Sequence, residues 1–148
     1  MPAREDWFEA ERLHRAAEEG NLPEIAALIA SGSDPNLFDD LGHTPLHRSV
    51  VGEQYKAAEL LLRLGANVNA NDEDRAGETA LSLAAQGEYP EMVELLLQNE
   101  ADPDLWGWMG LTARIRAQHR RDEEGMKISG LIQKYKPAKP NPGAKKCG

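Results

Sequence analysis

Apolar residues recur along this chain in short blocks, each with the spacing of a helix. The run Leu60-Leu61-Leu62 forms one block, and a second block has Met92, Val93, Leu96 and Leu97 at intervals of three and four residues. That spacing places the apolar side chains on one broad face of a helix. Polar residues, glycines and prolines lie between the blocks, where they end helices and form turns. The pattern predicts short amphipathic helices at these blocks, joined by turns.

The blocks belong to a longer motif that occurs several times. The segment Gly42-His43-Thr44-Pro45-Leu46-His47 is matched by Gly77-Glu78-Thr79-Ala80-Leu81-Ser82 and, more weakly, by residues 110–115. The threonines of the three copies are 35 and then 33 residues apart. A second motif follows the apolar runs: residues 65–69 read Gly-Ala-Asn-Val-Asn, and related turns occupy 32–36 and 101–104. Repetition at this period indicates a repeat architecture.

These two motifs resemble the ankyrin repeat family, whose unit is a turn plus two helices with a Thr-Pro-Leu-His signature. Thr44-Pro45-Leu46-His47 matches the signature in full, and the resemblance covers about residues 10–135. It implies an all-α fold, an ankyrin-repeat solenoid of about four helix-turn-helix units with protruding β-turn fingers, forming one domain over residues 1–135. We expect the units at about 8–37, 38–72, 73–107 and 108–135, with the first and last acting as caps.

The residues of the motif have physical reasons to be there. Thr44 is suited to cap the helix that follows it, and Pro45 fits the first turn of that helix because its missing N–H would be unpaired there. Gly65 supplies the positive φ that helix C-termini favour. A single unit is too small to bury its own apolar face, so neighbouring units have to stack. Residues 136–148 are rich in Pro, Gly and Lys and are expected to form a disordered basic tail.

Composition narrows the class of protein further. The length of 148 residues suits one soluble domain. The formal net charge of −8 argues against nucleic acid as the main partner. The charge is uneven: residues 1–111 contain 22 acidic and 7 basic side chains, whereas residues 112–148 contain 3 acidic and 10 basic ones. Cys147 is the single cysteine, so no intramolecular disulfide is possible. The chain shows no signal peptide and no membrane-length apolar run, and we expect a cytoplasmic protein without membrane contact.

Catalytic and metal-binding motifs are missing from the sequence. No phosphate-binding glycine-rich loop follows a strand, and no nucleophile motif is present, so we expect a protein that is not an enzyme and uses no cofactor. Metal ligation needs converging His, Cys or carboxylate spacing, which the chain lacks. The four histidines are expected to have structural or surface roles: His14, His43, His47 and His119. His14 and His47 occupy the same repeat position, which marks them as features of the repeat.

The resemblance implies protein binding through the turn tips and through the concave face formed by the first helices. The last tip is the most apolar, and its tryptophans and methionine are residue types that dominate interface hot spots or adapt to a partner: Trp106, Trp108, Met109 and Leu111. Trp106 has the alternative role of covering the end of the last helix pair. Phe38 and Leu41, at the turn tip formed by residues 38–43, are weaker candidates. Further variable positions on the first helices are Glu18, Glu19, Val51, Gln86 and His119, while Trp7 and Phe8 suit a cap on the first unit.

Acidic residues gather at two of the turn tips, residues 38–43 and residues 72–78. The tip at 72–78, between the other two, is the longest and holds Asp72, Glu73 and Asp74, followed by Arg75. With Asp39, Asp40 and Glu78, and with His43 beside them, these residues are expected to form an acidic row along one edge. Such a row steers a basic partner and raises its association rate. The alternative is that the row is solvated surface with no partner.

The leading hypothesis is therefore a non-catalytic protein that binds a partner with a basic and partly apolar surface, as an inhibitor or immunity-type protein or as a scaffold. The alternative is binding of nucleic acid or another anionic surface through the basic C-terminal repeat and tail. We expect the first helix of the last unit to carry four basic residues: Arg114, Arg116, Arg120 and Arg121. We expect a monomer or weak self-association, because opposite charges at the two ends favour head-to-tail contacts.

Overall fold

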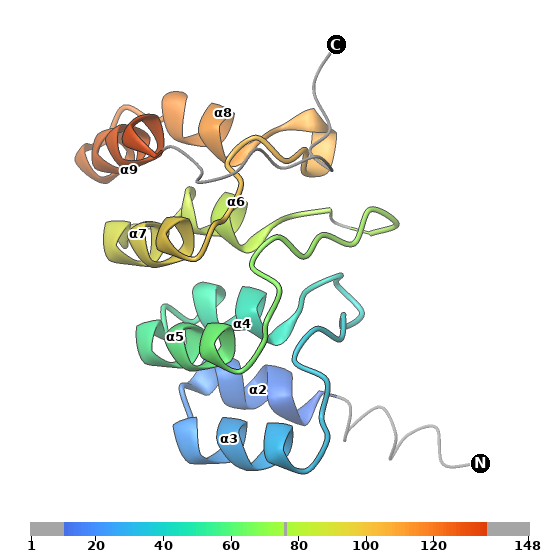
Figure 1. The fold of residues 1–148 in the computed structure, drawn as a ribbon. Coiled ribbons are helices and arrows are strands. Elements are labelled where there is room, and N and C mark those ends of the chain that lie inside the picture. Colours follow the sequence, from blue (N-terminus) through green and yellow to red (C-terminus); the bar gives the residue numbers. More distant parts are fainter. Residues whose placement is uncertain (1–10, 76, 136–148) are drawn as a thin grey trace. The chain divides into compact units, whose positions relative to one another are not determined.

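The computed structural model describes residues 11–75 and 77–135 of the chain, with the side chain of Trp108 left out. Trp7, Phe8 and the expected tail 136–148 lie outside these residues. The described residues form eight α-helices and one short 3-10 helix, with no strand among them, which confirms the predicted all-α class (Figure 1). None of these helices is long and apolar enough to cross a membrane. The chain divides into two compact units, residues 1–67 and 68–148.

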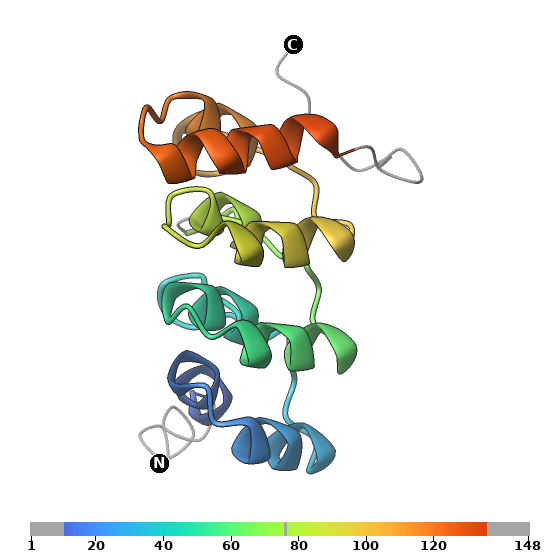
Figure 2. The same ribbon diagram turned by 90° about the vertical axis from the view of Figure 1, so that its left-hand side faces the viewer.

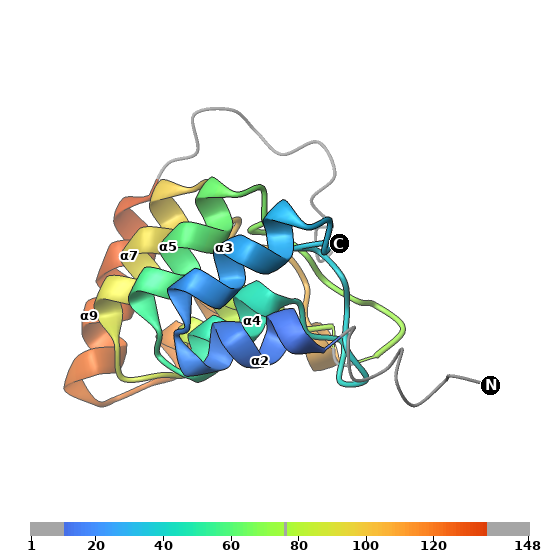
Figure 3. The same cartoon turned by 90° about the horizontal axis from the view of Figure 1, so that it is seen from below.

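The first unit holds two helix pairs. The first pair is α2 (Arg12–Glu19) with α3 (Leu22–Ala30), and the second is α4 (Pro45–Val51) with α5 (Tyr55–Arg63). Seen from below, α2 lies beside α4 and α3 lies beside α5 (Figure 3). A core cluster joins the pairs and is built from Leu13, Ala16 and Ala17 of α2, Ile25 and Leu28 of α3, and Ala57 and Leu61 of α5. The stacking expected from the small size of each repeat is thus present within this unit.

The second unit repeats the arrangement. Its first pair is α6 (Ala80–Ala84) with α7 (Pro90–Gln98), and its second is α8 (Ala113–Gln118) with α9 (Glu123–Lys134). Helix α9 packs along α7, and α8 packs against α6 (Figure 2). The fully buried side chains include Leu81, Met92, Leu96, Ile128 and Ile132. Helix α8 ends at Gln118, so Arg120 and Arg121 are not on it, contrary to the expectation from sequence.

The repeated threonines begin the first helix of three repeats. Thr44, Thr79 and Thr112 all have extended backbone, and each hydroxyl accepts a hydrogen bond from the amide three residues later. At Thr44 the bond is reciprocal, because Nδ1 of His47 accepts from the Thr44 amide at 3.1 Å. Two of the free N–H groups at this helix start are thereby satisfied. The capping role predicted for Thr44 is confirmed.

At two positions the backbone requires glycine, once because of a positive φ and once because of a close approach between helices. Gly65 has a φ of 104° after helix α5, as predicted for a residue that ends a helix in the left-handed region. Gly52 permits close packing of two repeats instead. A Cβ atom at Gly52 would lie 2.3 Å from the carbonyl oxygen of Glu18 on α2. The ends of α2 and α4 therefore approach each other more closely than any side chain at residue 52 would allow.

An asparagine clamp connects successive turns in each unit. In the first unit the side chain of Asn36 donates to the carbonyl of Gly65 at 3.2 Å and accepts from the amide of Asn67 at 2.6 Å. In the second unit Asn69 makes the same pair of bonds, to the carbonyl of Glu100 at 3.2 Å and from the amide of Asp102 at 2.8 Å. One amide side chain thus satisfies two backbone groups of the next turn, which regular helix bonding leaves unpaired.

Candidate protein-interaction surface

The finger of the first unit, residues 38–43, is closed by backbone hydrogen bonds. The amide of Asp39 donates to the carbonyl of His43 at 2.8 Å, and the amide of Gly42 donates to the carbonyl of Asp39 at 3.0 Å. The Asp39 carboxylate is buried and accepts from the amides of Leu41 and His43 at 2.9 and 3.0 Å. The loop backbone is therefore fixed by its own residues, as a preformed binding loop requires.

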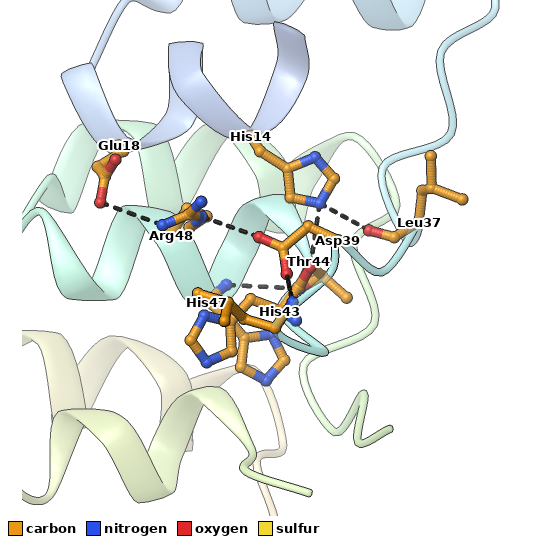
Figure 4. A network of polar contacts seen from close by, with 9 residues as sticks. His14, Glu18, Leu37, Asp39, His43, Thr44, His47 and Arg48 are labelled. Carbon is orange, nitrogen blue, oxygen red and sulfur yellow. Dashed lines mark hydrogen bonds and ion pairs between the residues drawn. The ribbon is translucent and has the colours of Figure 1, made fainter. Parts of the chain in front are cut away.

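Helices α2 and α4 hold this finger from outside (Figure 4). Nε2 of His14 lies 2.8 Å from the carbonyl of Leu37 and 3.0 Å from that of His43, and it donates because both partners are acceptors. Nε of Arg48 donates to the Asp39 carboxylate at 3.0 Å, and the same guanidinium lies 3.6 Å from Glu18. These contacts give the finger two anchors on neighbouring repeats.

The electrostatics of the finger follow from these contacts. Burial would raise the pKa of Asp39, but the hydrogen bonds from the amides of His43 and Leu41 and the charge of Arg48 outweigh burial and lower it below its ordinary value. The ring of His43 stacks on that of His47, with centroids 5.3 Å apart and planes 9° apart. Asp39 thus serves to build the finger and is not part of an exposed acidic row.

The apolar tip residues of two fingers occupy equivalent positions, each immediately before the glycine that precedes the capping threonine. Leu41 is 56% exposed in the first unit, and Met109 is 74% exposed in the second. Met109 also has a φ of 59°, within the short 3-10 helix Trp108–Gly110. A left-handed backbone is uncommon for methionine and marks a position where strain is tolerated. Phe38 and Trp106, the equivalent residues at the base of each finger, are half-buried.

The middle finger, residues 72–78, presents charge at its tip. Glu73, Asp74 and Arg75 are exposed, whereas Asp72 is half-buried. The Asp72 carboxylate accepts from the amide of Asp74 at 3.2 Å and lies 3.8 Å from the Arg75 guanidinium. Asp72 therefore shapes the turn while the next three residues face solvent. In the first unit Asp40 is exposed as well, and His43 is half-buried.

Glu78 does not belong to an exposed acidic row, contrary to the expectation from sequence. Its carboxylate is buried, where Oε1 pairs with Nη2 of Arg116 at 2.6 Å and Oε2 accepts from the Ser82 hydroxyl at 2.6 Å. The physical reason is that a carboxylate at this position reaches the arginine of the following first helix. Sequence reasoning missed the pair because its members are 38 residues apart.

A hollow of about 380 Å³ opens beside this ion pair in the second unit. Helix α8, the last finger and the turns that follow α6 and α8 supply its lining: Gln86, Glu88, Leu111, Arg116, His119 and Arg120. The structure therefore brings together Leu111 from the predicted apolar tip with Gln86 and His119. These two residues lie just after the ends of α6 and α8, and not on first helices as expected from sequence. The two arginines are additions that the sequence analysis had assigned to a basic surface. A signal was available, because Arg116 occupies the repeat position of Arg48.

Three arginines of the last repeat, Arg114, Arg116 and Arg120, are engaged within the chain. Arg114 makes two hydrogen bonds to Asp104, at 2.7 and 3.1 Å, and Arg116 pairs with Glu78. Arg120 pairs with Asp122 and also donates to the carbonyls of Ala85 and Gly87. These pairs neutralise charge that binding to phosphates would need. Across the described ranges, no group of three or more His, Cys, Asp or Glu is arranged to hold a metal ion.

Comparison with known proteins decides the family. The family model for ankyrin repeats, in three copies, matches residues 13–106. The chain belongs to the ankyrin repeat family. Ankyrin repeats generally mediate protein–protein interactions, and the family is typically non-catalytic. The fourth helix pair, α8 with α9, follows the matched range and completes the count of about four repeats expected from sequence.

Several longer proteins share these ankyrin repeats. Chicken inversin is 38% identical over 131 residues, which are 88% of this chain and 10% of inversin. Human B-cell lymphoma 3 protein is 32% identical over 124 residues, 78% of this chain and 27% of that protein. Mouse ARF GTPase-activating protein GIT2 is 33% identical over 104 residues, 66% of this chain and 14% of that protein. The chain thus spans about a tenth to a quarter of the length of these relatives, and the similarity concerns their ankyrin repeats.

Proposed function

We propose that this chain is a cytoplasmic, non-catalytic binding protein that occupies the surface of one partner protein through its finger tips. Occupancy of this kind suits an inhibitor or immunity-type protein, or a scaffold. The single observation that carries the proposal is the exposure of Leu41 and Met109 at equivalent tips. Both side chains are exposed at the same position of two repeats, as expected for contact residues on a repeated binding surface.

The backbone beneath these side chains supports the proposal. The first finger is closed by Asp39 and anchored by His14 and Arg48, so a partner would not have to order it on binding. Preformed loops bind more tightly because less conformational entropy is lost. Methionine at the last tip adds a flexible apolar side chain that adapts to an uneven surface.

The exposed carboxylates at the finger tips favour a partner whose contact surface has a basic patch beside an apolar patch. Asp40 in the first unit and Glu73 and Asp74 in the second are exposed at finger tips. Exposed charges of this kind act chiefly on the association rate, through steering, and their effect falls with added salt. The partner class is therefore a protein whose contact surface is partly apolar and carries lysines or arginines.

The test is capture of the partner by the full chain from an extract of the cells that produce it, followed by mass spectrometry. Met109→Asn is the informative variant, because asparagine tolerates a positive φ and leaves the finger backbone unchanged. Met126→Asn is the matched control: Met126 is 63% exposed on α9 and belongs to none of the fingers. We expect the wild-type chain and the Met126 variant to capture the same protein and the Met109 variant to lose it.

Two results would contradict the proposal. Capture that is equally strong in the Met109 and Met126 variants would exclude the last tip as a contact. Capture abolished by ribonuclease or deoxyribonuclease would show that nucleic acid carries the interaction. Circular dichroism of the variants controls for folding, because all three chains should have the same helix content.

A further inference from the structure

A second cavity lies between the second helices of the second unit, outside the surface described above. We call it the α7–α9 groove, because it opens between these two helices, which pack side by side (Figure 2). Its volume is about 410 Å³, and the described lining is Glu94, Leu97, Gln98, Glu100, Leu131, Lys134 and Tyr135. The two leucines are buried or half-buried and the charged residues are exposed, so the groove has an apolar floor and a charged rim. Ligand sites of about 300–1,000 Å³ typically combine an apolar lining with a few polar groups.

The charge of the rim arises from a difference between two second helices. In α5, Glu59 pairs with Arg63 one helical turn later, at 3.9 Å. The residues at the same positions of α7 are Glu94 and Gln98. The carboxylate is thus kept in α7 while its cationic partner is replaced by a neutral amide.

A second carboxylate stands where earlier repeats have glycine. The equivalents of Glu100 are Gly32 and Gly65, and all three positions have a positive φ, which is 69° at Glu100. Glycine adopts this backbone without strain, whereas glutamate is strained there. The third repeat therefore carries an additional acidic side chain at a position that lines the groove and that the backbone would otherwise reserve for glycine.

The rim keeps a net negative charge. Glu94 and Glu100 are exposed, and neither forms an ion pair with any residue in the part of the chain that the structure describes. Two carboxylates of the described lining thus stand against one ammonium group, that of Lys134. The pKa of Tyr135 reflects this charge: burial raises the pKa of its hydroxyl, and the charges of Glu100 and Asp102 raise it further. The rim therefore favours a cationic occupant.

We propose that the α7–α9 groove docks a short basic segment of a second protein. An apolar side chain of that segment lies on Leu97 and Leu131, and lysines or arginines beside it pair with Glu94 and Glu100. Both kinds of contact are needed, because exposed ion pairs alone add little affinity and act mainly on the association rate. The groove shares no residue with the finger tips, so a chain bound at both surfaces joins two proteins.

The probe for this site is a short synthetic peptide in which a central leucine is flanked by lysines. Titrated into the isotope-labelled full chain, it should shift the backbone amide signals of Leu97, Gln98 and Leu131 in NMR spectra. One comparison peptide has serine in place of the leucine, and another has glutamine in place of the lysines. Each should bind about tenfold more weakly, because the first loses the apolar contact and the second loses the ion pairs.

Two variants of the groove test the role of the carboxylates. Glu94→Gln/Glu100→Gln should raise the dissociation constant of the lysine peptide about tenfold, as the loss of two exposed ion pairs implies. Gln98→Arg restores the cation that Arg63 supplies in α5. It should weaken binding about threefold, because the new guanidinium pairs with Glu94 within the chain.

The matched control removes the same charge from the middle finger. In Glu73→Gln/Asp74→Asn both substituted residues are exposed and neither lines the groove. We expect this variant to bind the peptide at the groove as tightly as the wild-type chain does. The side chains substituted in all three variants are exposed, so the variants should fold, and circular dichroism checks their helix content.

The proposal would be overturned if the peptide shifted signals of the fingers alone, or if the dissociation constant were unchanged in Glu94→Gln/Glu100→Gln. Equal binding of the serine peptide would exclude the apolar floor and overturn it as well. Groove signals that shift with chain concentration in the absence of peptide would make the occupant a second copy instead. None of these outcomes depends on the partner proposed for the finger tips, so the two proposals stand or fall separately.

Discussion

Arg48 and Arg116 occupy the same position in two repeats, and each ties a finger to a first helix through a different carboxylate. Arg48 pairs with Asp39 in the finger of its own repeat at 3.0 Å. Arg116 pairs with Glu78 in the finger of the preceding repeat at 2.6 Å. One arginine position thus anchors the fingers in both units, and the carboxylate partner decides which finger is held.

Loss of the Glu78–Arg116 pair should destabilise the protein measurably. The two side chains are only 10% and 15% exposed, so Arg116→Met leaves a buried carboxylate without its charge partner. We expect the free energy of unfolding to fall by about 2 to 3 kcal/mol. Arg114→Met is the matched control, because its partner Asp104 is 57% exposed and such surface pairs contribute about 0 to 1 kcal/mol. Urea denaturation measures the free energy of unfolding of both variants. Equal losses would show that burial of the ion pair does not determine how much it stabilises the fold.

Stability should depend on pH through Asp39. Its pKa is lowered in the folded state, so the ionised carboxylate stabilises the fold at pH values above the unfolded pKa of about 4. This contribution is lost as the pH falls through the folded pKa. We therefore expect Asp39→Asn to unfold at a lower temperature than wild type at pH 7, with the gap shrinking below about pH 4. Thermal melts across the pH range test this, and a gap that stays constant to low pH would contradict it.

Two glycine-to-alanine substitutions should change the stability of the protein in opposite directions. Gly52→Ala places a Cβ 2.3 Å from the carbonyl oxygen of Glu18, and the backbone has to move to make room. We expect a loss of about 1 to 3 kcal/mol. Gly130→Ala adds a Cβ in open space within helix α9, where alanine is favoured over glycine by about 1 kcal/mol. Chemical denaturation should therefore show a lower midpoint for the first variant and a higher one for the second.

Glu100→Gly should stabilise the protein. Glycine adopts the φ of 69° without strain, although it also raises the entropy of the unfolded chain. The net gain should be about 0.5 to 1 kcal/mol. Glu100→Gln keeps the strained backbone and should leave the melting temperature unchanged, which separates strain from charge in a pair of thermal melts.

Sequence reasoning succeeded where the responsible interaction is local. Thr44 caps its helix and Gly65 takes a positive φ because neighbouring residues alone determine both outcomes. It was wrong about Glu78, whose burial depends on an arginine in the next repeat. A single sequence shows which residues are charged but not which of them form ion pairs. The position shared by Arg48 and Arg116 was the one signal that could have revealed the pair in advance.

At the finger tips the sequence could name residue types but not their roles. Asp39 and Asp40 are adjacent and look alike, yet the first closes the turn from inside and the second faces solvent. Which of two neighbouring carboxylates is turned inward follows from the turn geometry and from the position of Arg48. Trp108, whose side chain lies outside the described atoms, stays a prediction from sequence.

The asparagine clamps have a consequence for how such a chain can lengthen. Asn36 and Asn69 are 33 residues apart, and each bonds to the turn one repeat further on. The second repeat therefore carries both halves of the joint: Asn69 is the bonding side chain for its successor, and Gly65 and Asn67 supply the backbone groups for its predecessor. A copy of this repeat inserted in frame inherits both halves, so a gene can gain repeats without a new connection between them.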